Sequence, residues 1–334
     1  MPRQSTKARP TDWSRRRLLA AATAALALPA IARAEPLRLR IGHGLPATHP
    51  VHTAMMLFVD RVRERTGGAI EMTIYADGLI GQEPELITLA QSGKVDFIKV
   101  SASALERTAD PFRIFSLPFL FRDRAHWGAV TLNDVGQTIL GSAQPAGLLG
   151  LTYYDAGARS FYAQRPIDHP DDLKGLRTRI QPSPTMKRLM ALFGADGIEM
   201  PWEQVYPALK NRLVDGAENS VGALVVGRHG EVVSHYSFDE HTMVPDVFLV
   251  STARWQTFTP EQQTIIREAA RVSHERMDTL WVAFETQVRG QAEKMGVKFS
   301  RPDKAPFIAR AAPMAREFAG DPAISGLLGR IAQS

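Results

Sequence analysis

Apolar and polar positions between Lys174 and Ser220 predict three short strands that alternate with two helices. The expected strands are 176–180, 198–200 and 214–218, and the expected helices are 184–193 and a second one opened by Pro201. Ser183-Pro184 has the order of an N-cap and a first-turn proline, and Gly194 follows the last apolar position of that helix. This β-α-β-α-β order is typical of a parallel sheet, whose ligands bind beyond the carboxyl ends of the strands.

The same periodicities continue through the rest of the chain. Further strands are expected at 37–43, 70–75, 95–100, 149–154 and 297–300, and helices after Pro50, after Pro84, at 223–226 and after Thr259. Thr259-Pro260-Glu261-Gln262 has the form of a capping box, and the helical pattern then persists to Gly296. A helix of about 36 residues is roughly 50 Å long, which is too long for one small domain.

The first 34 residues have the pattern of an export signal. Ser14-Arg15-Arg16 begins a twin-arginine pattern, and an apolar, alanine-rich run extends to about Ala32. Ala32-Arg33-Ala34 forms an A-x-A cleavage site, which predicts Glu35 as the mature N-terminus. The alternative is a membrane anchor, which the short apolar run and the cleavage site disfavour. We therefore predict a twin-arginine signal peptide at 1–34 and a periplasmic location.

Removal of this leader changes the charge of the protein. The whole chain has 40 Lys and Arg, 35 Asp and Glu, and a formal net charge of +5. Seven of the basic residues and one acidic residue lie in 1–34, which leaves 33 basic and 34 acidic residues and a net charge of −1. We therefore expect no nucleic-acid partner. The absence of cysteine excludes disulfides, thiolate metal sites and a cysteine nucleophile.

Three residues are candidates for ligand binding because each lies near the end or start of a predicted element. They are Arg179, Trp202 and Asn219. The planar guanidinium of an arginine can hold a carboxylate through two hydrogen bonds. For an isolated arginine, a surface position on the strand is the alternative interpretation, and Trp202 could instead be a core residue.

Three segments together carry a resemblance to a known family. G-L-R-T-R (175–179), M-P-W-E-Q-V-Y-P-A-L (200–209) and V-D-G-A-E-N (214–219) resemble the extracytoplasmic substrate-binding proteins of TRAP transporters, the DctP family. L-P-F-L-F (117–121) is a further mark of that family. The resemblance implies an α/β, two-lobed periplasmic-binding-protein-like fold, with mixed sheets flanked by helices and a long helix bracing both lobes. Lobe I would comprise 35–156 and about 245–284, and lobe II 157–244 and about 285–334.

The resemblance also implies a set of ligand contacts. Arg179 would clamp a carboxylate with help from Arg159 and Asn219, while Trp202 would present an apolar face to a sugar ring. Glu83 matches an acidic or amide position of the family, although Glu83 could equally serve only as a helix-start carboxylate. Ser101 stands where some members carry glutamate. The remaining expected contacts are His43, on a loop that would form one lip of the cleft, and His241, for which a buried structural role is the stronger expectation.

The expected ligand is an organic acid delivered to TRAP permease subunits by a monomeric receptor. The segments 153–162 and 239–246 look like those of the family branch that binds hexuronates such as glucuronate and galacturonate. A C4-dicarboxylate or a keto acid remains an alternative. An exported hydrolase is a further alternative, but the chain has no G-x-S-x-G, H-E-x-x-H or P-loop motif. We expect no cofactor, and no metal site at His43, His49 and His52, which lack a ligand carboxylate at fixed spacing.

Overall fold

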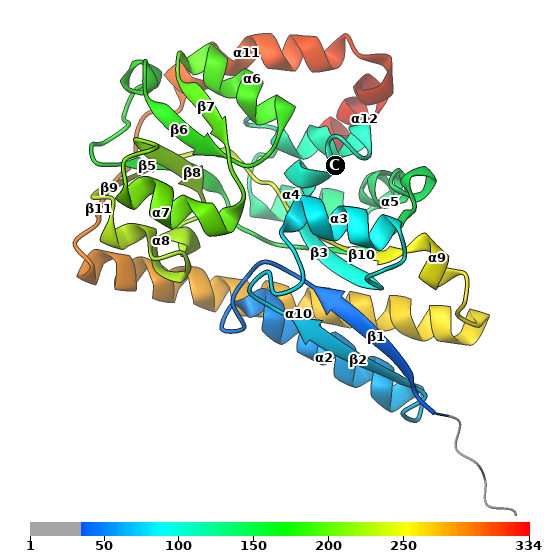
Figure 1. Cartoon of the computed structure of the whole chain (residues 1–334). Coiled ribbons are helices and arrows are strands. Elements are labelled where there is room, and N and C mark those ends of the chain that lie inside the picture. The colour runs from blue at the N-terminus through cyan, green and yellow to red at the C-terminus, as the bar shows by residue number, and fades with distance from the viewer. Residues whose placement is uncertain (1–34) are drawn as a thin grey trace, which may run out of the picture. The chain divides into compact units, whose positions relative to one another are not determined.

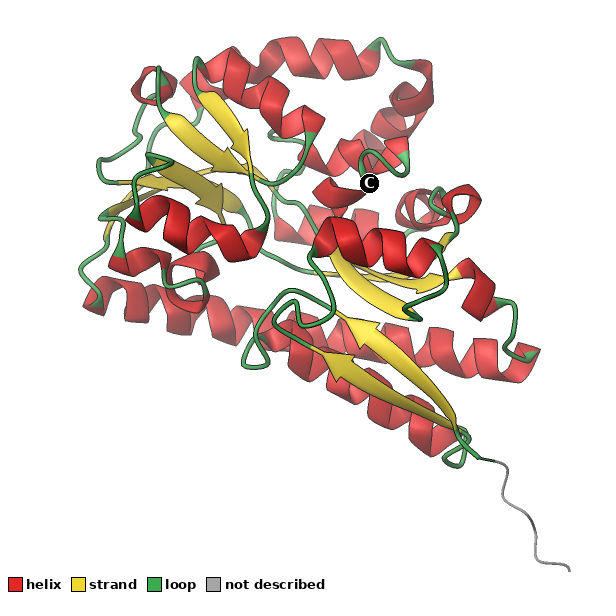
Figure 2. Ribbon diagram, viewed as in Figure 1, coloured by secondary structure: helices red, strands yellow, loops and turns green. Residues whose placement is uncertain are grey.

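The structure, a computed structural model, describes residues 35–334, and its strands form two sheets (Figures 1 and 2). The five-stranded sheet has the order β2-β1-β3-β10-β4, and the six-stranded sheet has the order β11-β9-β5-β8-β6-β7. The strands are β1 (Leu37–Gly42), β2 (Ile70–Tyr75), β3 (Phe97–Ser101), β4 (Leu148–Tyr154), β5 (Arg159–Ala163), β6 (Arg177–Ile180), β7 (Asp196–Glu199), β8 (Gly216–Asn219), β9 (His235–Thr242), β10 (Asp246–Ser251) and β11 (Lys298–Ser300).

Helices flank both sheets (Figure 2). The α-helices are α2 (Pro50–Arg65), α3 (Glu83–Gln91), α4 (Arg124–Leu132), α5 (Asp134–Gly141), α6 (Pro184–Phe193), α7 (Val205–Lys210), α8 (Gly222–Val226), α9 (Thr252–Trp255), α10 (Pro260–Lys294), α11 (Ala305–Ala319) and α12 (Pro322–Gln333). The 3₁₀ helices are η1 (Ala102–Leu105), η2 (Asp110–Ser116), η3 (Gln144–Ala146), η4 (Pro170–Leu173), η5 (Trp202–Gln204) and η6 (His229–Glu231). The mixed α/β fold predicted from the sequence is confirmed.

The β-α-β-α-β prediction is also confirmed. Both β7 and β8 pair with β6 in parallel. The Ser183 side chain accepts a hydrogen bond from the backbone N–H of Met186, and Gly194 ends α6 with a left-handed φ of 73°, which favours glycine. One detail differs, because the segment after Pro201 begins as η5 and becomes α-helical only at Val205.

Each sheet contains a central strand that runs antiparallel to its neighbour. Strand β5 pairs antiparallel to β8, with Ser160 opposite Asn219, and β10 pairs antiparallel to β3, with Asp246 opposite Ser101. An antiparallel strand begins where its neighbour ends. The first residues of β5 and β10 therefore lie at the carboxyl ends of β8 and β3.

Two connections and one long helix link the sheets. The chain passes from β4 to β5 through 155–158 and returns from β9 to β10 through 243–245. Helix α10 packs against α2 and β4 beside the five-stranded sheet, and against α8 beside the six-stranded sheet (Figure 1). The 35 residues of α10 and its Thr259 capping box agree with the predicted long helix.

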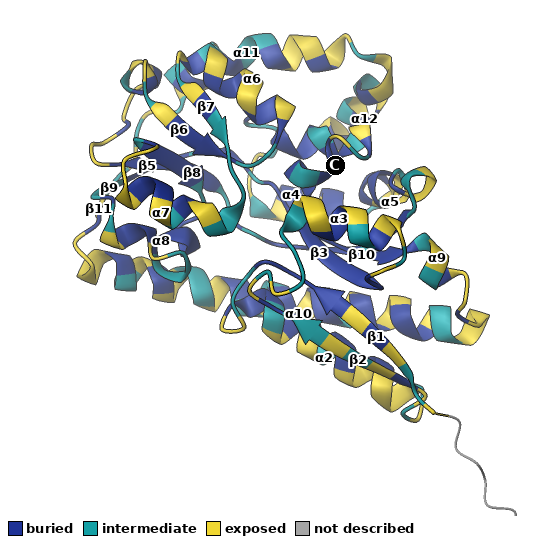
Figure 3. Cartoon of the chain, viewed as in Figure 1, coloured by how far each residue is buried: buried dark blue, intermediate teal, exposed yellow. Residues whose placement is uncertain are grey.

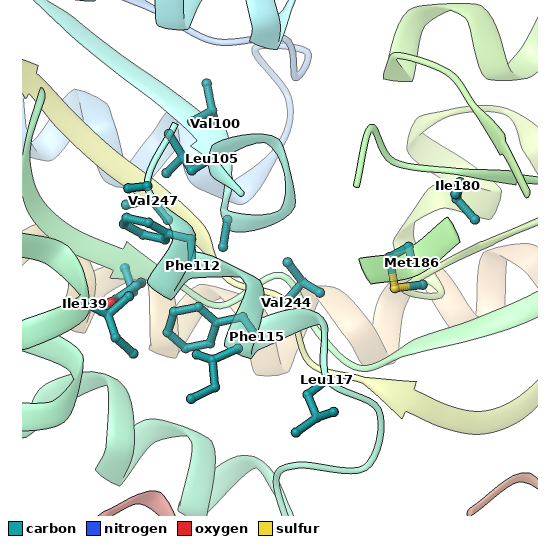
Figure 4. Packing of buried hydrophobic residues seen from close by; sticks show 14 of the residues in the cluster. Val100, Leu105, Phe112, Phe115, Leu117, Ile139, Ile180, Met186, Val244 and Val247 are labelled. Carbon is teal, nitrogen blue, oxygen red and sulfur yellow. The ribbon is translucent and has the colours of Figure 1, made fainter. Parts of the chain in front are cut away.

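Buried residues form a core along both sheets (Figure 3). One cluster includes Phe112 and Val247 from the five-stranded-sheet side and continues to Ile180 and Met186 on the six-stranded-sheet side (Figure 4). Leu117, from the L-P-F-L-F segment, is a buried member of the same cluster. The L-P-F-L-F segment therefore contributes to the core that the two sheets share.

The boundaries of the two lobes remain a prediction. Backbone contacts gather Pro36–Ser334 into one unit. Helix α11 packs on α6 of the expected lobe II, but α12 packs on α5 and η2 of the expected lobe I. The segment 285–334 therefore contacts elements of both expected lobes. Among residues 35–334 no helix combines the length and apolar character of a membrane span, and the predicted signal peptide lies outside these residues.

Candidate functional site

A cavity of about 790 Å³, including its open mouth, lies where strands of both sheets end, and we call it the central cavity. Strands β3, β6 and β8 contribute residues at their carboxyl ends, and β5 and β10 contribute the residues with which they begin. The polar and aromatic side chains of its wall include Glu83, Lys99, Ser101, Arg159, Arg179, Gln181, Trp202, Asn219, Asp246 and Trp281. Six of the eight predicted binding residues therefore meet at one cavity.

Arg179 is a buried cation without a carboxylate partner among the described residues. Its Nε and Nη2 both donate to the carbonyl oxygen of Met200, at 3.0 and 2.7 Å, and its Nη1 has no hydrogen-bond partner. Only 2% of the residue is exposed, and burial lowers the pKa of Arg179 from its usual value. The alternation of apolar and polar residues along the strand predicts Arg179 on the polar face. In the structure Arg179 is nevertheless buried, because it lies in the wall of the cavity. Arg179 lines the cavity, and its Nη1 is a buried donor that no other described residue uses.

Arg159, in contrast, is already neutralised within the protein. Its Nε donates to Glu218 Oε2 at 2.5 Å and its Nη2 to Glu218 Oε1 at 2.8 Å. The Nη1 of Arg159 donates to Asn219 Oδ1 at 3.0 Å, so it orients that amide at the cavity. Burial opposes ionisation of Glu218, but Arg159 and His241 overcome this effect and lower the pKa of Glu218 to about 2. Arg159 therefore lines the cavity as half of a buried ion pair.

On the opposite wall, Lys99 lies between two carboxylates. Its Nζ is 3.0 Å from Asp246 Oδ1 and 3.7 Å from Glu83 Oε1. Burial opposes the charge of Lys99, but the carboxylates of Asp246 and Glu83 outweigh this effect and raise the pKa of Lys99 above its usual value. For Glu83, burial is the largest effect and raises its pKa. Glu83 Oε1 also accepts a hydrogen bond from the backbone N–H of Ser101 at 2.9 Å. This wall offers an ammonium donor and carboxylate acceptors side by side.

One hydrogen bond joins the two walls directly. The hydroxyl of Ser101, at the end of β3, donates to Gln181 Oε1, just beyond β6, at 3.2 Å. Both side chains line the central cavity. The polar rims contributed by the two sheets thus lie within hydrogen-bond distance of each other.

Trp202 supplies an aromatic surface to the same cavity. The indole is half-buried, and its ring centroid lies 5.0 Å from that of His229 at an interplanar angle of 47°. Trp281, from α10, lines the cavity as well and is fully buried. The site therefore combines an unpaired cation, mixed donors and acceptors, and aromatic faces.

Two predicted contacts, His43 and His241, lie outside the cavity wall. The Nε2 of His43 is 3.0 Å from His52 Nδ1, and its Nδ1 accepts from the backbone N–H of Leu45 at 3.2 Å. Burial, with Lys99 and His52 nearby, lowers the pKa of His43 to about 3. His43 thus holds the loop that follows β1, and its side chain is engaged within the protein.

His241 lies behind the Arg159–Glu218 pair. Its Nδ1 is 2.8 Å from Asp239 Oδ2, and its Nε2 is 3.6 Å from Glu218 Oε2. Although burial opposes the charge, Asp239 and Glu218 raise the pKa of His241 to about 9. The buried structural role, the stronger of the two expectations, fits this geometry. Within residues 35–334, no three His, Asp or Glu side chains are grouped to hold a metal ion.

Sequence reasoning missed Lys99, Gln181 and Asp246 as residues of the cavity wall. Lys99 is a single charge within the apolar strand F-I-K-V-S, and a buried lysine needs a partner, so that pattern was a usable signal. Asp246 lies in the segment 239–246 that marks the family branch, but its partner Lys99 is distant in sequence. Gln181 directly follows β6, the strand that contains Arg179, and no sequence pattern around Gln181 indicated that it lines a cavity.

Comparison with known proteins now identifies the family. The family model for bacterial extracellular solute-binding proteins, family 7 (DctP), matches residues 41–321. The chain belongs to this family. Its members of known structure include TRAP periplasmic solute-binding proteins that superimpose on nearly the whole described chain.

Two such structures, each with a bound sugar acid, serve as examples. The protein from Xanthobacter autotrophicus Py2, with bound β-D-galacturonate, is 37% identical, covers 89% of this chain and 99% of its own, and has a TM-score of 0.86. The protein from Anaerococcus prevotii, with bound α/β-D-glucuronate, is 31% identical, covers 89% and 97%, and has a TM-score of 0.87. The 2,3-diketo-L-gulonate-binding periplasmic protein YiaO of Escherichia coli K12 is 29% identical over 69% of this chain and 71% of its own.

Proposed function

We propose that this DctP-family protein is a periplasmic receptor that captures a hexuronate, such as galacturonate or glucuronate, for a TRAP permease. The observation that carries the proposal is the buried guanidinium of Arg179, which lines the central cavity and, among residues 35–334, has no carboxylate partner and an Nη1 without a hydrogen-bond partner. A buried cation of this kind is costly unless an anion joins it. The carboxylate of the ligand would be that anion.

The balance of charge around the cavity supports one ligand carboxylate. Arg159 is neutralised by Glu218, and Lys99 lies between Glu83 and Asp246. Arg179 is then the basic side chain of the wall that remains uncompensated. We propose that it holds the acid group, with Asn219 beside it.

The opposite wall suits the hydroxyl groups of a sugar. A hydroxyl both donates and accepts, so it needs donors and acceptors close together. Lys99 supplies donors, while the carboxylates of Glu83 and Asp246 supply acceptors, and Ser101 and Gln181 can do either. Trp202 offers an aromatic face to the apolar side of a ring. The same wall disfavours a C4-dicarboxylate, because its second carboxylate would face Glu83 and Asp246.

We propose further that the two sheets belong to two lobes, divided near residues 156 and 245, which close over the ligand. The hydrogen bond between Ser101 and Gln181 supports a closed arrangement. The receptor would act as a monomer, exported by its twin-arginine leader, and would release its ligand chemically unchanged.

A calorimetric screen of the mature chain, residues 35–334, tests the ligand class. D-galacturonate and D-glucuronate should bind, whereas D-galactose, which has the ring but no carboxylate, should bind at least 100-fold more weakly. Succinate and 2,3-diketo-L-gulonate represent the alternatives. Tighter binding of either would overturn the hexuronate assignment. Recovery of the ligand by NMR after long incubation tests the absence of turnover.

A further inference from the structure

A buried histidine lies directly behind the aromatic wall of the central cavity. His229 has no solvent exposure, and its ring centroid is 5.0 Å from that of Trp202. The hydroxyl of Tyr162 is 2.8 Å from His229 Nδ1, while His229 Nε2 has no hydrogen-bond partner in the described part of the chain. His229 is therefore anchored on the side away from Trp202 and presents its other side to the indole.

This histidine continues an aromatic stack from the six-stranded sheet. The rings of Tyr236 and Tyr162 stack with centroids 6.0 Å apart and an interplanar angle of 7°, and Tyr162 stacks on His229 at 5.7 Å. The hydroxyl of Tyr236 donates to the backbone oxygen of Asn219 at 2.9 Å. The stack Tyr236–Tyr162–His229–Trp202 thus connects two parts of the cavity wall, Asn219 and the indole, through side chains of β9, β5, η6 and η5.

The backbone next to His229 is shaped for this close packing. A Cβ on Gly227 would lie 2.7 Å from His229 Nε2 and 2.7 Å from Trp202 Cη2. The φ of Gly227 is −83°, which any residue adopts, so glycine is needed there for space alone. Arg228 has a left-handed φ of 59°, an unfavourable conformation that turns the next residue, His229, inward.

Trp202 has room to leave the cavity on its other side. A depression of about 530 Å³, including open solvent, is lined by Trp202 and His229 together with Asp77, Glu203 and Tyr206. An indole without support could rotate toward this space. The contact with His229 opposes that rotation.

We infer that His229 is a positioning residue that fixes the Trp202 indole against the cavity, and that it thereby makes the site select cyclic sugar acids over open-chain acids. The selectivity rests on the proposed hexuronate function, because a pyranose has an apolar face that can lie on an indole and an open chain has none in fixed form. Burial and the nearby Arg179 lower the pKa of His229 to about 3, so the ring stays neutral and adds no charge to the site.

Calorimetry with a ring and an open-chain ligand tests the selectivity. D-galacturonate and D-gluconate each carry one carboxylate on six carbons, but gluconate is acyclic. His229→Ala should weaken galacturonate binding roughly 5- to 10-fold, the scale of one lost aromatic contact, and gluconate binding less than 2-fold. His229→Phe keeps an aromatic ring behind Trp202. It should therefore restore most of the preference for galacturonate over gluconate, measured as the ratio of the two affinities. An equal effect of His229→Ala on both ligands would overturn the selectivity.

A second measurement needs no ligand. The protein is labelled with 5-fluorotryptophan, and the ¹⁹F resonance of Trp202 is assigned by its loss in Trp202→Phe. His229→Ala should broaden or shift that resonance, whereas Phe307→Leu, a buried change on α11 outside the stack, should leave it in place. An unchanged Trp202 resonance in His229→Ala would refute the positioning role. Failure of the unaltered protein to bind either hexuronate would instead refute the proposed function.

Discussion

Replacement of Arg179 separates ligand recognition from fold stability. In Arg179→Ala the bound carboxylate loses its buried cation, and the loss of one partner of a buried charge pair costs about 2–5 kcal/mol. At about 1.4 kcal/mol per tenfold, affinity should fall roughly 30-fold to several thousand-fold. Arg179→Lys should also bind poorly. The guanidinium donates to Met200 O through Nε and Nη2 and still has Nη1 unused, and a lysine ammonium cannot reproduce this arrangement.

The unliganded protein should respond in a different way. Arg179 is a buried cation that has no carboxylate partner among the described residues, so its removal relieves a desolvation cost and should leave the melting temperature unchanged or raised. Arg159→Ala should do the reverse, because it leaves Glu218 buried and unpaired, at a cost of about 3–5 kcal/mol in unfolding free energy. Arg179→Ala should therefore lose affinity without losing stability, whereas Arg159→Ala should lose stability.

Isothermal titration with the preferred hexuronate and thermal melts without ligand provide the two measurements. Arg177→Ala is the matched control, since Arg177 is two residues earlier on β6, largely exposed and paired with Asp215. It should bind like the parent protein. The reasoning is wrong if Arg179→Ala binds within a few-fold of the parent, or if Arg177→Ala is the more damaging change. In either case the acid group is held elsewhere, with Arg159 the next candidate.

Three further predictions concern pH, closure and export. Because the pKa of His241 is raised to about 9, its stabilising effect is complete below its unfolded value near 6.5 and is lost as pH rises to about 9. Over that window the parent should lose up to about 3 kcal/mol of unfolding free energy in urea titrations; equal slopes for the parent and His241→Gln would contradict this. Saturating hexuronate should reduce the radius of gyration in small-angle scattering, whereas an unchanged radius would indicate a site that is closed before binding. The double variant Arg15→Lys, Arg16→Lys should accumulate in the cytoplasm, and normal periplasmic levels in cell fractionation would argue against twin-arginine export.

The sequence predicted the elements around Arg179 well because the signals there are local. Ser183, Pro184 and Gly194 each act within one turn of α6, and the strand period of β6 is visible over five residues. Arg159 could be placed at the cavity only by resemblance. Its pairing with Glu218 depends on the antiparallel register of β5 and β8, which joins residues 59 positions apart.

The pairing of Lys99 with Asp246 could not be predicted from local sequence patterns for the same reason, since the two residues are far apart in the chain. Asp246 lies on β10, which returns to the five-stranded sheet only after the chain has passed through the six-stranded one. His43 looked accessible because it follows a strand at the expected lip of a cleft, yet His52, in the first turn of α2, engages it. The elements around Arg179 that depend on neighbours in sequence were confirmed, whereas contacts that depend on a long-range register could not be predicted from local patterns.

The connections between the sheets run directly into residues of the cavity wall. The passage through 155–158 ends at Arg159, and the passage through 243–245 ends at Asp246. Under the proposed closure of two lobes, a substitution in either passage would alter both the rate of opening and the affinity for the ligand. A single substitution in these passages would therefore not change ligand affinity without also changing the rate of ligand release. Evolutionary changes of ligand preference are then expected at Trp202, Gln181 and Lys99, which line the cavity but lie outside both passages.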